Sequence, residues 1–184
     1  MDQPTHYCQY VSNLPQDNLH KIYHDTQYGR PINEDNQLFE LLILEINQAG
    51  LSWNTILKKR KNFYLAYDNF HLPTVAQYGE KEINRLLGDS GIIRNRMKIN
   101  ATIHNAQIIT NLVGEYGSFK NWLDEHHPLS HQEWTKLFRS TFKFTGPEIV
   151  KEFLMSSGYL EGAHTTDCPI YQDILSHHPP WTIV

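Results

Sequence analysis

The sequence predicts an all-helical protein that forms a single domain. Apolar residues recur three and four positions apart along most of the chain, which is the spacing of one face of a helix. The alternation of apolar and polar residues that would indicate strands is nearly absent. The chain has 184 residues, of which 40% are apolar, and this is enough to bury one sizeable core. We therefore expect residues 1–184 to form one domain without an internal repeat or a linker.

The helices can be assigned in chain order from these apolar positions. The first four segments with helical spacing are Leu38–Ile46, Ile56–Tyr67, Ile83–Leu87 and Arg94–Val113. The fourth segment is predicted to be one long helix or one broken helix. Glycines are predicted to mark the joints between segments, and these are Gly88, Gly91, Gly114 and Gly117.

Two further helices flank a tight hairpin near the C-terminal end. Helical patterns at 134–138 and 148–157 are joined by Phe142-Lys143-Phe144-Thr145-Gly146-Pro147. Gly146 can adopt backbone angles that other residues avoid, and Pro147 suits the first turn of a helix. The backbone amides at the start of such a helix can hold a phosphate oxygen. A purely structural turn has the same features, so both interpretations stay open at this point.

The overall charge does not favour a protein that coats nucleic acid. The net charge is −4, whereas nonspecific nucleic-acid binding uses clusters of Lys and Arg. Basic residues at Lys58–Lys61 and at Arg94, Arg96 and Lys98 could form one favourable face, or they could be solvated helix surface. No stretch is long and apolar enough to span a membrane, and Met1–His6 lacks the features of a signal peptide. We expect a soluble cytoplasmic protein.

Cysteine and histidine residues from the two ends of the chain form a candidate metal site. Cys8 and Cys168 are the only cysteines, and a disulfide between them is disfavoured in a reducing compartment. His164 stands four residues before Cys168, so the two would project to one side of a helical turn. Adding Cys8 and His24 gives two thiolates and two imidazoles, a closed tetrahedral set that suits structural zinc.

One carboxylate stands within an apolar helix. Glu45 follows Leu44, and Leu41 and Leu42, one turn earlier, are also apolar. A buried carboxylate is costly without partners, so we expect Glu45 to face a polar cavity. The alternative is a position on the solvent side of an amphipathic helix. Trp53 follows two turns later, beyond a glycine break.

Several blocks of the sequence together resemble the 3-methyladenine DNA glycosylase I family. The blocks span nearly the whole chain in order, and they are Cys8 to Trp53 with its string Gln48-Ala49-Gly50-Leu51-Ser52-Trp53, Gly91 to Ile99, Phe142 to Gly146, and His164 with Cys168. The resemblance implies a helix-hairpin-helix glycosylase fold, with that motif around 133–158. It also implies a structural zinc ion that joins segment 8–24 to segment 164–168.

The implied activity is DNA base-excision repair. Hydrolysis of the N-glycosidic bond would release 3-methyladenine from alkylated double-stranded DNA, after the base has been flipped out into a pocket. The expected working unit is a monomer. A different class of protein is the alternative: a non-catalytic, zinc-stabilised helical module that binds damaged DNA. A metallohydrolase that uses the zinc directly conflicts with a closed set of four ligands.

The resemblance also assigns roles to residues. Glu45 matches the carboxylate of the family's pocket that hydrogen-bonds the edge of the adenine. Tyr23 matches the tyrosine beside the histidine that binds zinc, and Trp53 matches the tryptophan whose indole stacks on the base. Leu51 lies where the family approaches the gap in the duplex. The residues expected to contact DNA are Leu51, Lys143 and Gly146, and those that match the zinc ligands are Cys8, His24, His164 and Cys168.

Four positions depart from the family pattern. Gln9 and Tyr10 stand where the family commonly has Gly-Trp, Tyr28 stands in place of a tryptophan, and Ile46 replaces a glycine. These departures concern the shape of the pocket. Asp167 is a conceivable counterpart of an aspartate that some helix-hairpin-helix glycosylases place beyond the hairpin, although an exposed loop position is the expected alternative.

Overall fold

The structure is a computed structural model that describes residues 6–183. These residues form helices and connecting segments without a strand, which confirms the predicted all-helical class. No helix in this part of the chain is long and apolar enough to cross a membrane. The expectation that the chain lacks a signal peptide rests on Met1–His6, and most of that segment lies outside the described residues.

The described residues form eleven α-helices and two short 3-10 helices. The α-helices are α1 (Tyr7–Ser12), α2 (Leu19–Thr26), α3 (Asp35–Gln48), α4 (Trp53–Ala66), α5 (Leu72–Val75), α6 (Glu80–Gly88), α7 (Arg96–Tyr116), α8 (Phe119–His126), α9 (His131–Thr141), α10 (Pro147–Ser156) and α11 (Tyr171–Ser176). The 3-10 helices are η1 (Asp68–Phe70) and η2 (Pro180–Thr182).

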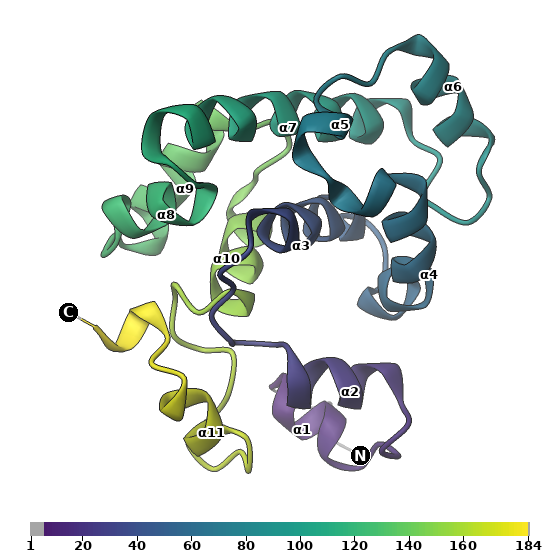
Figure 1. The fold of residues 1–184 in the computed structure, drawn as a ribbon. Coiled ribbons are helices and arrows are strands. Elements are labelled where there is room, and N and C mark those ends of the chain that lie inside the picture. The colour runs from purple at the N-terminus through teal and green to yellow at the C-terminus, as the bar shows by residue number, and fades with distance from the viewer. Residues whose placement is uncertain (1–5, 184) are drawn as a thin grey trace.

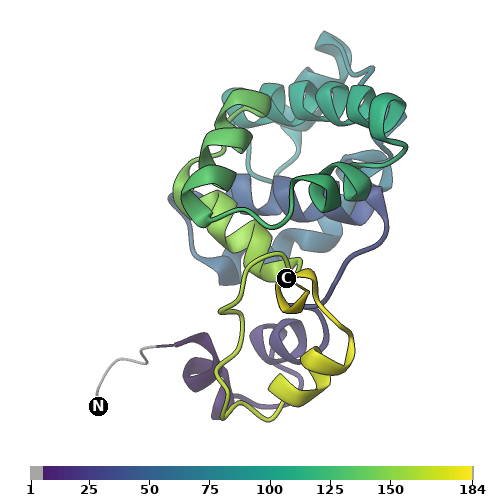
Figure 2. The same cartoon turned by 90° about the vertical axis from the view of Figure 1, so that its left-hand side faces the viewer.

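The two ends of the chain meet at one end of the molecule. Helices α5 to α9 occupy the upper part of Figure 1, whereas α1, α2 and α11 lie together at the bottom. Figure 2 shows the same division from the side. Segments that are far apart in the sequence are therefore neighbours in space, as a metal site built from both ends requires.

Helix α3 runs through the centre of the molecule (Figure 1), so acidic residues on it can be buried. Every residue from Leu38 to Asn47 is buried, because α3 packs against α4, α7, α8 and α10. A helix that is apolar on nearly all sides belongs in a core. Glu40 and Glu45 are the acidic residues of this buried stretch, so each needs a partner or a cavity.

The long segment after residue 94 forms one unbroken helix. Helix α7 runs from Arg96 to Tyr116 and ends at Gly117, which has the left-handed φ of 85° typical of a helix C-terminus. Gly114 lies inside this helix, so the prediction that it marks a joint was wrong. The turn chemistry at Gly117 ends the helix, because only that glycine must adopt a positive φ there.

Candidate active site and metal cluster

A pocket of about 760 Å³ brings together the three residues predicted to recognise a base. Glu45 comes from the last turn of α3, Trp53 is the first residue of α4, and Tyr23 comes from α2. Tyr28 and Glu152 also line this pocket, which we call the base pocket. Glu45 is thus buried against a cavity, as expected, and is not on the solvent side of its helix.

The Glu45 carboxylate is buried without a counter-charge. Its residue is 4% exposed, and it has no hydrogen-bond or ion-pair partner among residues 6–183. Burial raises the pKa of Glu45 well above its ordinary value, and the nearby Glu152 carboxylate raises it further. A buried acid of this kind is relieved by a bound cation or a hydrogen-bond donor. The pocket is therefore prepared for a positively charged ligand.

Aromatic rings form the walls of the base pocket. The Tyr23 ring meets the Trp53 ring edge-on, and the centroids of these two rings are 5.2 Å apart. The Tyr28 ring is tilted relative to the Tyr23 ring, with a centroid distance of 5.7 Å. The Tyr23 hydroxyl donates a hydrogen bond to Ser156 Oγ at 3.2 Å, which fixes its ring. The buried Trp53 Nε1 has no partner within the described part of the chain. Such walls suit a flat cation, which is attracted to the faces of aromatic rings.

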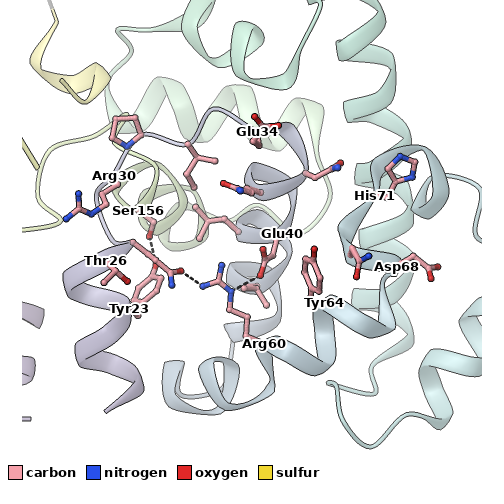
Figure 3. A pocket seen from close by; sticks show the side chains of 18 of the residues that line it. Tyr23, Thr26, Arg30, Glu34, Glu40, Arg60, Tyr64, Asp68, His71 and Ser156 are labelled. Carbon is pink, nitrogen blue, oxygen red and sulfur yellow. Dashed lines mark hydrogen bonds and ion pairs between the residues drawn. The ribbon is translucent and has the colours of Figure 1, made fainter. Parts of the chain in front are cut away.

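A second cavity lies on the other side of the same two rings. It measures about 900 Å³ and is lined by Tyr23 and Trp53, but not by Glu45. Figure 3 shows that two of its charged groups, Arg60 and Glu40, pair with each other. Glu40 accepts a hydrogen bond from Arg60 Nε at 2.6 Å, and Arg60 also donates to Gln27. The larger cavity thus offers less unpaired charge to a ligand than the base pocket does.

The turn between α3 and α4 exposes an apolar side chain beside the base pocket. Leu51 is 39% exposed, and its backbone N–H donates to the Gln48 carbonyl at 2.7 Å. Gly50 adopts a φ of 80°, which this tight turn requires. Ser52 then caps α4 by accepting a hydrogen bond from the Thr55 amide. Leu51 is thereby held on a defined turn as a projecting apolar group.

The side chain of Lys98 holds this turn in place through hydrogen bonds to its backbone. It is 8% exposed, and its ammonium group donates to the carbonyls of Asn47 and Ala49 at 3.0 and 2.9 Å. These are carbonyls at the C-terminal end of α3, where a cation is favourable. Lys98 is therefore a positioning residue for the turn and is not part of a basic surface.

Other members of the two basic runs are also engaged within the protein. Lys59 donates to the carbonyls of Ser90 and Gly91, and Arg60 pairs with Glu40. The residues of the first run that are exposed are Lys58 and Lys61. Lys59, Arg60 and Lys98 are therefore engaged within the protein, whereas Lys58, Lys61, Arg94 and Arg96 are exposed.

The hairpin between α9 and α10 is fixed by a buried side chain. Asn105 of α7 accepts a hydrogen bond from the Lys143 amide at 2.8 Å and donates one to the Lys143 carbonyl at 3.1 Å. The left-handed residue of the hairpin is Phe144, with φ of 61°, whereas Gly146 has an ordinary φ of −72°. Gly146 therefore does not use the backbone angles that only a glycine adopts readily, and Phe144 takes the left-handed conformation of the turn. The Lys143 amide is used internally, which leaves its exposed side chain for other contacts.

Gly146 nevertheless leaves space at the start of α10. A Cβ atom built on Gly146 would meet nothing within 4 Å, and no side chain caps the first turn of the helix. The first amides of a helix lack partners within that helix, so they are available to an anion. A glycine here keeps the surface open where a phosphate could approach.

Gly146→Val is expected to weaken binding to duplex DNA by about two- to tenfold, for damaged and undamaged duplexes alike, because one or two backbone contacts to phosphate are lost. Fluorescence anisotropy with both duplexes measures this. Gly114→Val is the matched control, since a Cβ there also meets nothing within 4 Å and the site lies in α7. Unchanged affinity of Gly146→Val would make the hairpin a purely structural turn.

The four predicted metal ligands converge at the joined chain ends. Cys8, His24, His164 and Cys168 are all buried, and their ligand atoms lie within 4.8 Å of one another. Cys8 Sγ lies 3.3 Å from His24 Nε2, and Cys168 Sγ lies 3.5 Å from His164 Nδ1. Tetrahedral zinc with its usual bond lengths separates sulfur and nitrogen ligands by roughly 3.6 Å. The donor set and its spacing fit a closed, four-coordinate ion.

Neighbouring groups orient both imidazoles toward the centre of this cluster. His24 Nδ1 lies 2.7 Å from Asp25 Oδ1, and His164 Nε2 lies 2.8 Å from the Tyr28 carbonyl. The remaining ring nitrogen of each histidine faces the sulfur atoms, as in protein metal sites. Burial raises the pKa of the Cys168 thiol to about 11, so a thiolate at neutral pH needs a cation beside it.

The chain between His164 and Cys168 is not a helical turn of the kind expected. It is a loop with a tight turn, closed by a hydrogen bond from the Cys168 amide to the Thr165 carbonyl at 2.9 Å. Asp167 lies on this loop with its side chain exposed, and it is not among the residues that line the base pocket. This agrees with an exposed loop residue.

The departures from the family pattern fall in different places. Ile46 is fully buried in the core, and Tyr10 is 42% exposed and stacks on Tyr7. Neither lines the base pocket, and neither does the exposed Gln9. Tyr28 does line it, with its hydroxyl turned toward Glu152. The pocket thus differs from the family pattern through Tyr28.

Sequence analysis missed several residues of the site. Glu152 lies in a helix that was predicted, but nothing in the pattern showed which face of that helix meets Glu45. Lys98 was counted as a surface charge, although its position among Met97, Ile99 and other helical apolar residues is a signal for burial.

Comparisons with known proteins agree on one family. The family model described as "Methyladenine glycosylase" matches residues 13–137. DNA-3-methyladenine glycosylase 1 of Escherichia coli (strain K12) is 34% identical, over 89% of this chain and 96% of its own length. The structure of 3-methyladenine DNA glycosylase I from Staphylococcus aureus is similar with a TM-score of 0.78 and 32% identity, covering 89% of this chain and 95% of that one.

A further solved structure is a variant of 3-methyladenine DNA glycosylase I in complex with 3-methyladenine. It has a TM-score of 0.77 and 31% identity, and the match covers 89% of this chain and 96% of that one. The sequence matches span most of both chains, and the solved structures share the arrangement of helices. The chain therefore belongs to the methyladenine glycosylase family.

Proposed function

We propose that this protein acts in DNA base-excision repair by hydrolysing the N-glycosidic bond of 3-methyladenine in alkylated DNA. The observation that carries this proposal is the Glu45 carboxylate, buried without a partner between aromatic walls. Relatives and solved structures that match most of the chain are 3-methyladenine DNA glycosylases, one of them in complex with the base. A damaged base is also the easiest to extrude from a duplex, because it is weakly paired.

In this proposal Glu45 recognises the flipped base. Methylation at N3 gives the attached adenine a positive charge, and its exocyclic amine is a hydrogen-bond donor. The buried carboxylate accepts from that amine and complements the charge, and charge-assisted hydrogen bonds are the stronger kind. Trp53 and Tyr23 hold the flat base through ring contacts.

The chemistry needs little help from a strong general acid. When the bond between the base and C1′ breaks, its electron pair moves to the cationic base, which leaves as neutral 3-methyladenine. The positive charge that develops on the sugar is then quenched by water, which adds to C1′ and loses a proton. Binding and orientation of the cationic base by Glu45 therefore carry most of the selection.

We propose that the DNA surface surrounds the mouth of the base pocket. Leu51 projects beside Trp53 and enters the gap left by the flipped base, while Lys143 and Gly146 contact phosphates at the hairpin. Helix α10 starts next to the hairpin and contributes Glu152 to the pocket six residues after Gly146, which is roughly 9 Å along a helix. One helix thus connects the hairpin with a wall of the base pocket. The partner is alkylated double-stranded DNA.

We propose that the metal is zinc and that its role is structural. The set of two thiolates and two imidazoles is typical of closed zinc sites, and no position remains for a reacting water. All residues assigned to the base pocket, the hairpin and the metal cluster belong to one chain. Residues 1–184 are accordingly proposed to work as one domain and as a monomer.

The test is the release of free bases from methylated DNA. The protein is incubated with duplex DNA treated with a methylating agent, and the released bases are separated by chromatography. We expect 3-methyladenine to appear as the main free base, and none from unmethylated duplex. If the protein binds the methylated duplex but releases no base, the alternative of a non-catalytic binding module is correct.

A further inference from the structure

A second carboxylate, that of Glu152, lines the base pocket. Glu152 lies on the second turn of α10 and lines the same cavity as Glu45. Its Oε2 accepts a hydrogen bond from the Tyr28 hydroxyl at 3.3 Å. Glu152 is half-buried and forms no ion pair among the residues that the structure describes. The function proposed above does not use it.

We propose that Glu152 is a second recognition carboxylate of the base pocket, anchored by the Tyr28 hydroxyl, and that with Glu45 it makes the pocket select purines that carry a positive charge. This inference rests on the proposed function and deepens it. The substrate class it names is cationic N-alkylpurine nucleotides, in preference to neutral purines of the same shape.

The charges around the pocket support this selection. The ionisable residues that carry most of its charge are Glu45, Glu148, Glu152, Glu161, Lys151 and His6. Four of these are glutamates, and the lysine is exposed to solvent, where its charge is screened. Glu45 is buried and Glu152 is half-buried, whereas Glu148 and Glu161 are exposed, so among the four glutamates these two contribute most to the field inside the cavity. A neutral ligand gains nothing from this field.

The Glu45 and Glu152 carboxylates also repel each other within the base pocket. Burial raises the pKa of Glu152, and repulsion from Glu152 adds to burial in raising the pKa of Glu45. Two like charges that share a site are both relieved when a cation lies between them. Binding of a cationic base thus offsets the repulsion between the Glu45 and Glu152 carboxylates, whereas a neutral base does not.

The Tyr28 hydroxyl holds Glu152 in a defined position. Tyr28 is 5% exposed, and its ring contacts the Tyr7 and Tyr23 rings at centroid distances of 5.5 and 5.7 Å. Its backbone carbonyl also accepts a hydrogen bond from His164. Because ring and backbone are both fixed, the hydroxyl presents a stationary donor to the Glu152 carboxylate. Tyr28 is accordingly a positioning residue.

The experiment compares two ligands that differ in charge. The cationic probe is 3,9-dimethyladeninium, which cannot lose its charge by leaving a sugar, and the neutral probe is 9-methyladenine. Their dissociation constants for the full-length protein are measured by titration calorimetry. We expect Glu152→Gln to weaken binding of the cation about tenfold and to leave binding of the neutral probe nearly unchanged, because one near charge is removed.

Two further variants separate a recognition role from a structural one. Tyr28→Phe removes only the anchoring hydroxyl and is expected to weaken cation binding less than Glu152→Gln does. The double variant should bind the cation no more weakly than Glu152→Gln alone, since the hydroxyl acts through that carboxylate. Glu125→Gln is the control: it removes the charge of an exposed glutamate of α8 that does not line the base pocket, so little effect on the binding of either probe is expected.

The outcomes distinguish this inference from the proposed function. Glu152→Gln that keeps the preference for the cation, or that weakens both probes equally, overturns the role of Glu152, even if the wild type releases 3-methyladenine. A wild-type protein that prefers the cation and releases no base overturns the proposed function, and the role of Glu152 in cation selection then still holds. Thermal denaturation of each variant reports whether it is folded.

Discussion

Replacing Glu45 by glutamine is expected to slow the single-turnover release of 3-methyladenine from methylated DNA roughly ten- to hundredfold. Glutamine keeps the size of the side chain and one acceptor but removes the charge that complements the cationic base. A hydrogen bond to a charged group contributes about 1.5 to 3 kcal/mol, and about 1.36 kcal/mol corresponds to a tenfold change in rate. Release of 7-methylguanine, which presents a carbonyl in place of the amine, should depend less on this charge.

The same substitution is expected to leave thermal stability unchanged or to raise it at neutral pH. Burial holds the pKa of Glu45 well above its ordinary value, so the native state binds this proton more tightly than the unfolded state does. Stability contributed by such an acid is therefore lost as the pH rises above the unfolded-state pKa. Glutamine does not ionise, so the variant escapes this loss. Activity and stability thus move in opposite directions.

The pH dependence of the rate gives a second signature. Recognition of a cation uses the ionised form of Glu45, so the wild-type rate should rise as the pH increases through the raised pKa of this group. The groups that face it are Tyr23, Tyr28 and Glu152, and desolvation by burial is the largest cause of its shift. The rate of Glu45→Gln should lack this part of the profile.

Glu40→Gln is the matched control on the same helix. Glu40 is also buried, but it pairs with Arg60 and lines the other cavity. Removal of one partner from this pair should lower thermal stability while release of 3-methyladenine stays close to the wild-type rate. Equal release by the wild type and Glu45→Gln would show that Glu45 is not the recognition residue.

The helical parts of the fold were predictable because the apolar residues that a helix buries recur three and four positions apart in the sequence. The segments with strong periodicity correspond to α3, α4, α6, α7, α9 and α10. Helices α1, α2, α5, α8 and α11 were not assigned, since each has only four to eight residues and little room for a repeating pattern. Gly114 was misjudged because a glycine within a long helix looks the same in the sequence as one at its end.

The candidate site was predictable where single residues carry unusual chemistry. Glu45 stands out as an acid in an apolar stretch, and the cysteines and histidines stand out by type, so their convergence could be anticipated. Glu152, Lys98 and Asn105 could not be identified in this way. Their roles depend on which helix faces meet in space, as in the contact of Lys98 with the carbonyls that end α3, and one sequence does not record such contacts.

Of the changes considered, removal of the metal is expected to lower the free energy of unfolding the most. Metal analysis of protein purified without chelator should find one zinc ion per chain. Cys168→Ser should abolish stoichiometric zinc binding and lower stability by about 4 kcal/mol or more, as expected for loss of a structural metal site. For a chain of this size that corresponds to a decrease in Tm of roughly 8–16 °C, which thermal denaturation measures.

The effect on the base pocket should be uneven, because the metal ligands contact Tyr7 and Tyr28 of the pocket wall, whereas no hydrogen bond or ring contact within residues 6–183 joins them to Glu45 or Trp53. His164 donates to the carbonyl of Tyr28, so loss of the ion frees that ring, whereas Glu45 and Trp53 are held by the core around α3 and α4. We expect the variant to keep its helical content while binding of 3-methyladenine weakens. Asp167→Ala is the control, since Asp167 is an exposed residue between two ligands and should change neither zinc content nor Tm. Wild-type protein purified without zinc, with the same Tm as Cys168→Ser, would contradict a structural metal and leave packing, hydrogen bonds and the Arg30–Asp173 ion pair as the links between the chain ends.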